Sequence, residues 1–525
     1  MSSLESALTI PQLLAAAATH YGESMAIEEE NSRLSYHRLD QLRRQAARAL
    51  LALEVKAGDR VAIWAPNIHE WIVAAIALQS VGAVLVPLNT RMKGAEAGFI
   101  LRESGARALF LIGEFLGTSY PALLADELLP ELQHRISLRS EVEGCLGWET
   151  FLTLGDGVSP AELDVREVEV DEHSLSDLLF TSGTTGKPKG VMTAHGQNLQ
   201  IVRDWSAMVG LRQGDRYLIV NPFFHSFGYK AGWLAALMRG CCILPQQVFD
   251  VPVMLERIAR ERITVLPGPP TLYQSILSHP NRQDYDLGSL RVAVTGAASV
   301  PVEMVRRMRS ELGFETIVTA YGLTEACGFV TICRPGDSPE LVANTSGRAF
   351  PDVEVRCVDG NGQPVPPGVA GEIQVRGYNL MRGYFNNPEA TAEAIDAEGW
   401  LHTGDVGVLD EQGYLRITDR LKDMFITGGF NVYPAEIEQV ILRYPGVAQA
   451  AVIGIPDERL GEVAMAFLLP AAGQHVDTQA FLTWCREQMA NYKVPRRALL
   501  LEAMPLNAAG KVTKDALRKL TEAAS

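Results

Sequence analysis

Short apolar runs alternate with helix-like stretches from the start of the chain to about residue 400. Most of these runs are followed by Gly, Pro, Ser or Thr, which are typical of a strand that ends in a loop. The clearest runs are 60–64, 108–112, 178–181, 217–220, 265–267 and 292–295. Buried strands that alternate with helices predict layered α/β subdomains with largely parallel sheets. The ligands of such sheets lie at the carboxyl ends of the strands.

The most apolar stretch, 71–88, requires a choice between a membrane helix and a protein core. Gln79, Ser80, Gly82 and Pro87 interrupt it. A helix that spans a bilayer needs about 20 consecutive apolar residues. We therefore predict a buried helix that leads into a buried strand at 83–86, and we do not expect an integral membrane protein.

The pattern changes after residue 353, where short strands are separated by turns. The predicted strands are 353–358, 371–375 and 414–418, and one of the turns is Asp359-Gly360-Asn361-Gly362. Turns of Asp, Asn and Gly between short apolar runs are typical of antiparallel sheets. We predict a small β-rich subdomain that completes the large N-terminal domain, residues 1–419.

A dense charge cluster at 419–423 precedes a last segment with a pattern of its own. Pro434 is placed to open a helix, because its fixed φ suits a first helical turn, and strands are expected at 450–453 and 465–469. We predict a small mobile α+β domain, residues 420–525, joined by a hinge at 420–423. The alternative for the charge cluster is an ordinary surface loop.

Length and charge narrow the class of protein. At about 100–200 residues per domain, 525 residues form several units, and a hydrophobic content of 47% supplies large cores. Lys and Arg number 47 and Asp and Glu 62, which gives a net charge of −15. This balance, without a basic tract, argues against nucleic acid as a partner. A polyphosphate would have to be bound by local backbone donors, a few cations or a metal.

The cysteines and the N-terminus indicate a reduced compartment. Seven cysteines make an odd number, and none forms a CxxC pair. The first ten residues contain Glu5 but no Lys or Arg, unlike the basic front of a secretory signal. We expect a cytoplasmic protein without structural disulfides.

The segment from Leu178 to Gly190 carries the clearest chemical signal. After the apolar run, residues 181–186 are only Thr, Ser and Gly, and two lysines follow with Pro188 between them. Backbone N–H groups, hydroxyls and ammonium groups in such a loop can surround phosphate oxygens. It is not a Walker loop, because Pro188 stands where that pattern needs its second Gly. A mobile surface turn is the alternative.

This segment resembles the phosphate loop of the adenylate-forming superfamily, which includes acyl-CoA synthetases, peptide-synthetase adenylation domains and firefly-type luciferases. Five further segments resemble the remaining signatures of the family: 296–298, 321–325, 400–405, 419–438 and 507–511. The resemblance extends over essentially the whole chain. The resemblance implies the family fold, with a large N-terminal domain and a small mobile C-terminal domain.

The resemblance also implies how ATP and Mg²⁺ would be bound. The residues expected to hold the phosphates are Thr181, Ser182, Gly183, Thr184, Thr185, Gly186, Lys187 and Lys189. Those expected to line the adenine are Gly296, Ala297, Ala298, Tyr321 and Gly322. Asp405 and Arg420 would bind the ribose. Gly428 and Gly429 would let the backbone approach the ligand. Glu325 and Thr184 would ligate Mg²⁺, and Thr324 would donate to the α-phosphate.

The chemistry of these residues fits, although each has a simpler interpretation. Asp405 offers two acceptors for two ribose hydroxyls, and Glu325 offers the oxygen ligands that Mg²⁺ prefers. Alternatively, Asp405 lies in a surface turn, Glu325 supports a helix start that Thr324 caps, Tyr321 belongs to the core, and Arg420 forms an ordinary ion pair.

Lys511 and Lys422 are assigned roles in two successive half-reactions. By resemblance, Lys511 lies between the carboxylate of the acid and the α-phosphate during adenylation. A cation there would reduce the repulsion between two anions as they react. The thiol of CoA then attacks the acyl-adenylate, and Lys422 would be the pivot that exchanges the two arrangements.

The segment 222–240 is expected to line the acid pocket. Phe224 and His225 resemble the family's gate between the acid pocket and the thiol tunnel, and a buried core histidine is the alternative for His225. The segment contains no Asp or Glu, which argues against an amino acid, because its ammonium group would lack a partner. No carrier-protein domain follows Ser525, so we expect a free-standing acid–CoA ligase.

Finer resemblance concerns the identity of the acid. The segments 223–232, 263–277 and 292–305 are similar to bacterial ligases that activate an indanedione propanoate left from steroid rings C and D. Tyr229 and Lys230 would then be candidate donors to a ring ketone, since a polar pocket group discriminates strongly. The alternative is a medium- or long-chain fatty acid, with Lys230 extending to the surface.

Two other classes remain open from sequence. A luciferase-type oxygenase would share every adenylation motif, and a non-catalytic relative would bind nucleotide alone. The intact motifs around Lys511, Glu325 and Asp405 disfavour the second. A homodimer is compatible with the sequence, which does not determine the oligomeric state.

Overall fold

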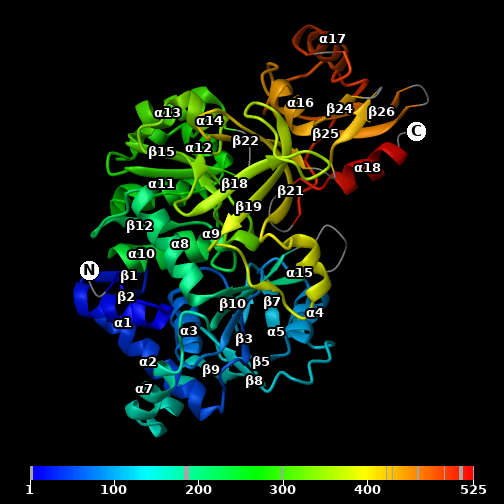
Figure 1. Ribbon diagram of the computed structural model, residues 1–525. Helices are drawn as coiled ribbons and strands as arrows, with labels where there is room; N and C mark the ends of the chain where they lie inside the picture. The colour runs from blue at the N-terminus through cyan, green and yellow to red at the C-terminus, as the bar shows by residue number, and fades with distance from the viewer. Residues whose placement is uncertain are drawn as a thin grey trace. The chain divides into compact units, whose positions relative to one another are not determined.

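The computed structural model describes residues 4–181, 188–296, 300–420, 423–427, 430–457, 460–489, 491–507 and 512–523. The chain divides into two compact units (Figure 1). Unit 1 comprises Met1–Val355 and Val375–Leu401, and unit 2 comprises Arg356–Gln374 and His402–Ser525. These units are defined by compactness, and the predicted domain boundary between residues 419 and 420 stays a prediction.

The first sheet of unit 1 has eight strands in the order β20-β11-β10-β4-β3-β5-β8-β9. Their bounds are Gly383–Tyr384, Lys189–Ala194, Leu175–Thr181, Val84–Pro87, Arg60–Trp64, Ala106–Leu111, His134–Ser137 and Leu146–Gly147. Neighbours from β10 to β9 are parallel, whereas β11 is antiparallel to both β10 and β20. The strands predicted at 60–64, 108–112 and 178–181 are confirmed.

The second sheet of unit 1 is built in two halves. One half is β12-β13-β1-β2, with bounds Arg216–Ile219, Cys242–Pro245, Met25–Glu29 and Ser32–Ser35. The other is β14-β15-β16-β17, with bounds Val292–Gly296, Thr316–Tyr321, Thr331–Ile332 and Arg348–Ala349. Val265 bridges Tyr217 and Val292, so the strand predicted at 265–267 is present as one pairing position between the halves. Proline at 267 offers no N–H to continue the ladder.

Helices cover these sheets, and Figure 1 shows α12, α13 and α14 grouped around β15. Helix α3, His69–Ser80, is buried along nearly its whole length and leads into β4, as predicted for the apolar stretch. The remaining elements of unit 1 are α1 Ile10–Tyr21, α2 Tyr36–Ala52, α4 Gly94–Ser104, β6 Glu114–Phe115, β7 Thr118–Ser119, α5 Tyr120–Leu123, α6 Trp148–Leu154, η1 Gly155–Gly157, α7 Pro160–Val168, α8 His195–Met208, α9 Ser226–Gly228, the π-helix η2 Tyr229–Leu234, α10 Ala235–Arg239, α11 Val251–Glu261, α12 Pro270–Leu277, η3 Arg282–Asp284, α13 Val302–Leu312, η4 Thr324–Ala326, α14 Pro339–Asn344 and α15 Pro388–Ala394.

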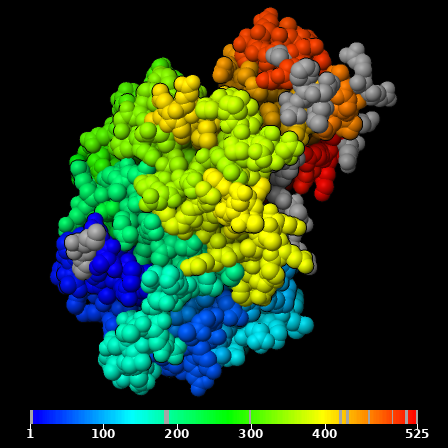
Figure 2. Space-filling model, in the orientation of Figure 1, coloured from blue at the N-terminus to red at the C-terminus, as the bar shows by residue number. Residues whose placement is uncertain are grey.

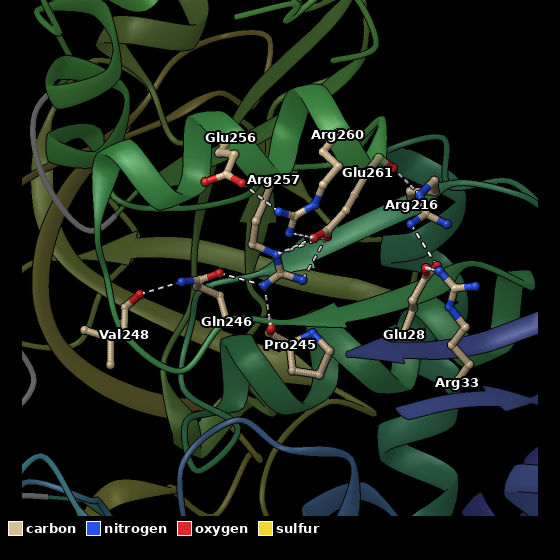
Figure 3. Close-up of polar contacts among 10 residues, drawn as sticks. All are labelled: Glu28, Arg33, Arg216, Pro245, Gln246, Val248, Glu256, Arg257, Arg260 and Glu261. Atoms are coloured by element: carbon tan, nitrogen blue, oxygen red, sulfur yellow. Dashed lines mark hydrogen bonds and ion pairs between the residues drawn. The ribbon is translucent and has the colours of Figure 1, made fainter. Parts of the chain in front are cut away.

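A polar network fastens α11 to the ends of the neighbouring strands (Figure 3). Arg257 Nη1 donates to the carbonyl of Pro245 at 2.8 Å and to Gln246 Oε1 at 2.6 Å. Farther along the same sheet, Arg216 Nη2 donates to Glu28 Oε2 at 2.9 Å and joins β12 to β1. The two bonds of Arg257 fix α11, the helix that precedes the Val265 crossing.

The N-terminal helix α1 docks on two later helices of unit 1. The backbone N–H of Ile10 donates to Nδ1 of buried His195 at 3.3 Å, and the hydroxyl of Tyr21 donates to the carbonyl of Met238 at 3.2 Å. Figure 2 shows the blue N-terminal residues packed against green residues on the displayed face. Among the helices that the structure describes, we find none with the length and apolar run required to cross a bilayer.

Two sheets and three helices make up most of the C-terminal part. The first sheet is β18-β19-β21-β22, with bounds Val353–Val358, Ala370–Gly377, Leu401–Leu409 and Leu415–Arg420. The second is β24-β23-β26-β25 with β27 beside β26, and the bounds are Phe430–Val432, Phe425–Thr427, Gly461–Pro470, Val447–Asp457 and Arg497–Leu500. The helices are α16 Pro434–Ile441, α17 Thr478–Gln488 and α18 Lys514–Ala523.

Side chains of β26 alternate between the two faces of this last sheet. Ala464, Ala466 and Leu468 join one apolar cluster, and Met465 and Phe467 join another. The first cluster includes residues of α16 and α17, and the second includes Leu517 of α18. Successive side chains of a strand point to opposite faces of the sheet. The two apolar clusters therefore cover both faces. The predicted α+β character, the helix beginning at Pro434 and the strands at 450–453 and 465–469 are confirmed.

Candidate active site

The phosphate-loop candidate connects two antiparallel strands of unit 1. Thr181 at the end of β10 pairs with Lys189 at the start of β11, and Phe180 pairs with Gly190. The segment is therefore followed by an antiparallel strand, so that β10 and β11 form a hairpin, whereas a Walker loop leads into a helix. Ser182, Gly183, Thr184, Thr185, Gly186 and Lys187 lie outside the described residues.

The adenine candidates meet at the carboxyl ends of two parallel strands. Gly296 ends β14 and pairs with Ala320 of β15, directly before Tyr321. A Cβ on Gly296 would lie 2.7 Å from the carbonyl oxygen of Ala320, so only glycine fits without a shift. The topology thus brings Gly296 and Tyr321 to one edge, where α/β ligands bind. Ala297 and Ala298 lie outside the described residues.

The turn after Tyr321 is a compact single turn of 3-10 helix. A Cβ on Gly322 would lie 1.9 Å from the carbonyl oxygen of Gly328, so the turn closes on the bare backbone of Gly322. The residue at the N-cap of the 3-10 turn is Leu323, not Thr324, so the interpretation of Thr324 as a helix cap is wrong. Thr324 and Glu325 are both half-buried.

Tyr384 is a site residue that sequence reasoning missed. Its hydroxyl donates to Glu325 Oε1 at 2.9 Å, and Lys189 Nζ lies 5.0 Å from the centroid of its ring. Burial raises the pKa of Tyr384, and the Glu325 carboxylate raises it further, so the hydroxyl keeps its proton. One tyrosine therefore links the Mg²⁺ candidate to a phosphate candidate. Its partner Glu325 lies 59 positions away in the chain, so no local pattern marked it.

The two gate candidates, Phe224 and His225, are not fully buried. His225 is exposed, and its Nδ1 accepts the backbone N–H of Phe227 at 3.1 Å, so the alternative of a buried core histidine is wrong. Phe224 is half-buried, and its neighbour Phe223 is fully buried. The position leaves the side chain of His225 accessible to a ligand.

Tyr229 and Lys230 are fully buried in unit 1. Lys230 Nζ lies 3.3 Å from Asp177 Oδ1 on β10, and the hydroxyl of Tyr229 accepts from Gln79 Nε2 at 3.0 Å. The alternative in which Lys230 extends to the surface is wrong. Burial raises the pKa of Tyr229 well above its ordinary value, with a further contribution from Asp177. The assignment of both residues to a substrate ketone stays a prediction.

The ribose candidates lie on two paired strands of unit 2. Asp405 in β21 is directly opposite Arg420 in β22, which brings their backbones together. Asp405 is 8% exposed and part of a strand, so its interpretation as a surface-turn residue is wrong. Beside it, the carboxylate of Glu372 accepts from the backbone N–H of Gly404 at 3.3 Å.

The C-terminal lysine candidate is bracketed by described backbone pairs. Leu506 and Val512 form an antiparallel bridge, and the N–H of Thr513 donates to the carbonyl of Pro505 at 2.8 Å. Lys511 itself, together with Lys422, Gly428 and Gly429, lies outside the described residues.

A second group of ligand-type side chains lies elsewhere in unit 1. Glu29, His69 and Glu70 have ligand atoms within 4.8 Å of one another. Arg139 already occupies the centre, with Nη2 2.7 Å from Glu70 Oε2 and a contact to Glu29. This guanidinium supplies the charge that a metal would bring, so we interpret the cluster as an ion-pair network.

Comparison with known proteins gives consistent results over the whole chain. The model of the AMP-binding enzyme family matches residues 14–385, and the model of the AMP-binding enzyme C-terminal domain matches residues 436–511. The chain is 48% identical over 522 residues to the 3-[(3aS,4S,7aS)-7a-methyl-1,5-dioxo-octahydro-1H-inden-4-yl]propanoyl:CoA ligase of Rhodococcus jostii RHA1, covering 98% of this chain and 99% of the relative. It is 49% identical over 512 residues to the ligase of the same name from Mycobacterium tuberculosis, with the same coverage.

A solved structure agrees with this result at the level of the fold. The anthranilate CoA ligase AuaEII in complex with anthranoyl-AMP superposes with a TM-score of 0.88 at 26% identity, and each chain is covered completely. The expected large N-terminal domain and small C-terminal domain of an adenylate-forming enzyme are confirmed.

Proposed function

The chain belongs to the AMP-binding enzyme family, and from this premise we propose that it is an AMP-forming acid–CoA ligase. An acid carboxylate attacks the α-phosphate of ATP, and acyl-AMP forms as pyrophosphate leaves. The thiol of CoA then attacks the acyl carbon, and the thioester forms as AMP leaves. The observation that carries the proposal is identity near one half, along almost their entire lengths, to two propanoyl:CoA ligases.

The first half-reaction needs cations and donors rather than a general base. A carboxylic acid is already ionised at neutral pH, so the barrier comes from bringing two anions together. We assign Lys511 to the carboxylate and α-phosphate, Thr324 to the α-phosphate, and the 181–189 loop to the other phosphates. Lys189 at the base of the hairpin supports this assignment, because it lies beside Tyr384 and thus near Glu325.

Glu325 is suited to hold Mg²⁺ together with Thr184. Its half-buried carboxylate is an oxygen ligand of the kind that Mg²⁺ prefers, and Tyr384 orients one of its oxygens. Mg²⁺, when bound, would neutralise phosphate charge. The protein supplies the orientation of the carboxylate.

We propose that the acid is the bicyclic diketo propanoate named for the two relatives. The neighbourhood of the acid-pocket segment supports a neutral rather than an ammonium-bearing side chain. The positive charge of Lys230 is compensated by Asp177 within the core, and no acidic residue of 222–240 remains to pair with a substrate amine. A fatty acid is the second candidate, because it too lacks a charge beyond its carboxylate.

The test is a substrate panel with Mg-ATP, read by pyrophosphate release and by thioester formation. We expect the bicyclic acid to exceed octanoate and palmitate in kcat/KM by about tenfold or more, as pocket contacts to a ketone would require. Preference for palmitate by an order of magnitude would assign the chain to fatty acids instead. Failure to release pyrophosphate with any acid would refute the ligase.

The same panel separates the other classes. Pyrophosphate release without CoA, followed by thioester only when CoA is added, is the pattern of a ligase. A luciferase-type oxygenase would consume oxygen after adenylation, and a non-catalytic relative would bind ATP without turnover.

A further inference from the structure

A buried polar cluster lies in the interior of unit 1, and apart from the predicted contact of Tyr229 and Lys230 with a ring ketone the proposed reaction assigns it no role. Its members are Gln79, Ser176, Asp177, Thr193, Asn198, Tyr229 and Lys230. Each is at most 1% exposed. The cluster draws side chains from α3, β10, β11, α8 and the π-helix η2, so it joins five elements in the interior.

The carboxylate of Asp177 is the centre of this cluster. Thr193 Oγ1 donates to Oδ1 at 2.6 Å, while Ser176 Oγ and Asn198 Nδ2 donate to Oδ2 at 2.7 and 2.6 Å. A carboxylate with this set of donors is held in one orientation. Its charge is stabilised by short hydrogen bonds that few other geometries would provide.

Lys230 supplies the only opposite charge to this carboxylate among the contacts that the structure describes. Its Nζ lies 3.3 Å from Asp177 Oδ1 and donates to Thr193 Oγ1 at 3.1 Å. Burying either charge alone is costly, so each one requires the other in place. The pair therefore ties η2 to both strands of the hairpin, because Asp177 is on β10 and Thr193 is on β11.

The elements that this pair joins carry the candidate chemistry at their other ends. The hairpin carries the 182–187 loop between β10 and β11. Helix η2 begins at Tyr229, whose backbone N–H donates to the carbonyl of His225 at 2.9 Å. A fixed η2 thus fixes the backbone of the gate residue.

The same segment also contacts the turn that contains Glu325. Gly328, with φ +94°, approaches so closely that a Cβ there would lie 3.1 Å from Oγ of Ser226. Helix η2 is a π-helix with a non-helical Gly232, and such wide turns are frequent at functional sites. The ion pair, the gate segment and the turn with Glu325 are therefore linked through a continuous series of contacts within unit 1.

We propose that Lys230 and Asp177 are positioning residues: their buried ion pair holds the gate segment at 224–226 in register with the phosphate-loop hairpin, and so aligns the acid with ATP. The inference rests on the proposed function. It replaces direct donation by Lys230 to a substrate ketone with an action through Asp177, and it applies to every acid that the enzyme accepts.

The experiment compares Lys230→Met, Asp177→Asn and the double variant with the wild type. Each single change leaves one buried group unpaired, so we expect the melting temperature to fall by about 5 °C or more. The double variant removes both charges and should return to within about 3 °C of wild type. Its adenylation kcat, read by pyrophosphate release, should stay about tenfold or more below wild type. The reason is that the ion pair no longer holds η2 in a fixed position against β10.

Two acids separate positioning from recognition. The loss in the double variant should be equal, within about twofold, for the bicyclic acid and for the best acid of the panel without a ring ketone. Lys56→Met, an exposed lysine outside the cluster, is the control and should match the wild type. Wild-type activity is measured first, so a failure of the ligase itself is distinguished from a failure of this inference.

Three results would overturn the inference. A stable double variant with wild-type kcat would mean that the pair only stabilises the fold. A loss confined to the ketone-bearing acid would mean that Lys230 contacts the substrate. A double variant whose melting temperature stays as low as that of the single variants would mean that the loss of stability does not come from an unpaired charge.

Discussion

At the scale of single residues, Tyr384 shows the limit of sequence reasoning. Lys189 and Glu325 were predicted from motifs, because the residues that define each motif are neighbours in the chain. Tyr384 joins them only in space, through its ring and its hydroxyl. Asp177 was missed for the same reason, since its partner Lys230 belongs to another element. Local sequence therefore does not show which side chains will contact each other inside the folded protein.

Tyr384→Phe should weaken the hold on Glu325 while keeping the ring near Lys189. The lost hydrogen bond is to a charged group, so we expect adenylation kcat to fall by about 3- to 20-fold. Mg²⁺ should be required at higher concentration, because the carboxylate is less well oriented. The measurement is pyrophosphate release over a Mg²⁺ titration.

Tyr36→Phe is the matched control for this change. It also removes a buried hydroxyl, which donates to the carbonyl of Cys241 at 2.7 Å, away from Glu325. Its melting temperature should fall while its Mg²⁺ midpoint stays at the wild-type value. If both variants shift the midpoint equally, Tyr384 has no special link to the metal site.

Secondary elements were predicted best where burial makes a strand uniformly apolar. The runs at 60–64 and 292–295 coincide with β3 and β14 within one residue. The run at 265–267 was reduced to Val265, since prolines follow it. The hairpin partner β11 and the π-helix η2 could not be predicted. A lysine and a glycine at the start of β11 hide its strand pattern, and η2 depends on contacts with distant elements.

The turn from Gly322 to Gly328 gives a prediction at the scale of an element. Gly322→Ala would place a Cβ 1.9 Å from a backbone carbonyl oxygen, so the turn with Thr324 and Glu325 must shift. We expect adenylation to fall by more than about tenfold and stability by about 1–3 kcal/mol. Gly157→Ala, where a Cβ meets nothing within 4 Å, should change neither. Kinetics and thermal melting of both variants provide the measurement.

The docking of α1 on α8 predicts a pH dependence of stability. Burial lowers the pKa of His195 from 6.5 to about 4, partly offset by Asp177. The unfolded chain therefore takes up the proton first, so this stability is fully present above about pH 6.5 and is lost as the pH falls toward 4. The full difference is about 3 kcal/mol, at about 1.4 kcal/mol for each pH unit.

Melting curves between pH 7.5 and pH 5 test this expectation. His195→Gln keeps an acceptor for the N–H of Ile10 but does not titrate. Its stability should be nearly flat over this range, while that of the wild type declines. Parallel curves for the two proteins would refute the role of His195.

At the scale of the whole molecule, the candidate site residues are distributed over both units of the chain. The motifs for adenine, Mg²⁺ and the phosphates fall in unit 1, whereas Asp405, Arg420 and Lys511 fall in unit 2. Sequence could predict the order of the signatures along the chain, because each signature is contiguous and the order follows the family. It could not predict the internal supports of each part, such as the pairing of Lys514 with Asp423 and Glu438 at 3.8 and 3.6 Å.

Lys511→Ala tests whether the two half-reactions use the C-terminal part differently. Loss of a charge-stabilising group should lower adenylation by about 100-fold or more. Thioester formation from pre-made acyl-adenylate should remain near wild type, because the carboxylate and the α-phosphate no longer have to be brought together. Lys514→Ala is the companion variant: it loosens the start of α18 but leaves Lys511 in place, so its loss in adenylation should be smaller. Equal loss of both steps in Lys511→Ala would contradict a lysine that acts in adenylation alone, and with it the hinge proposed at Lys422.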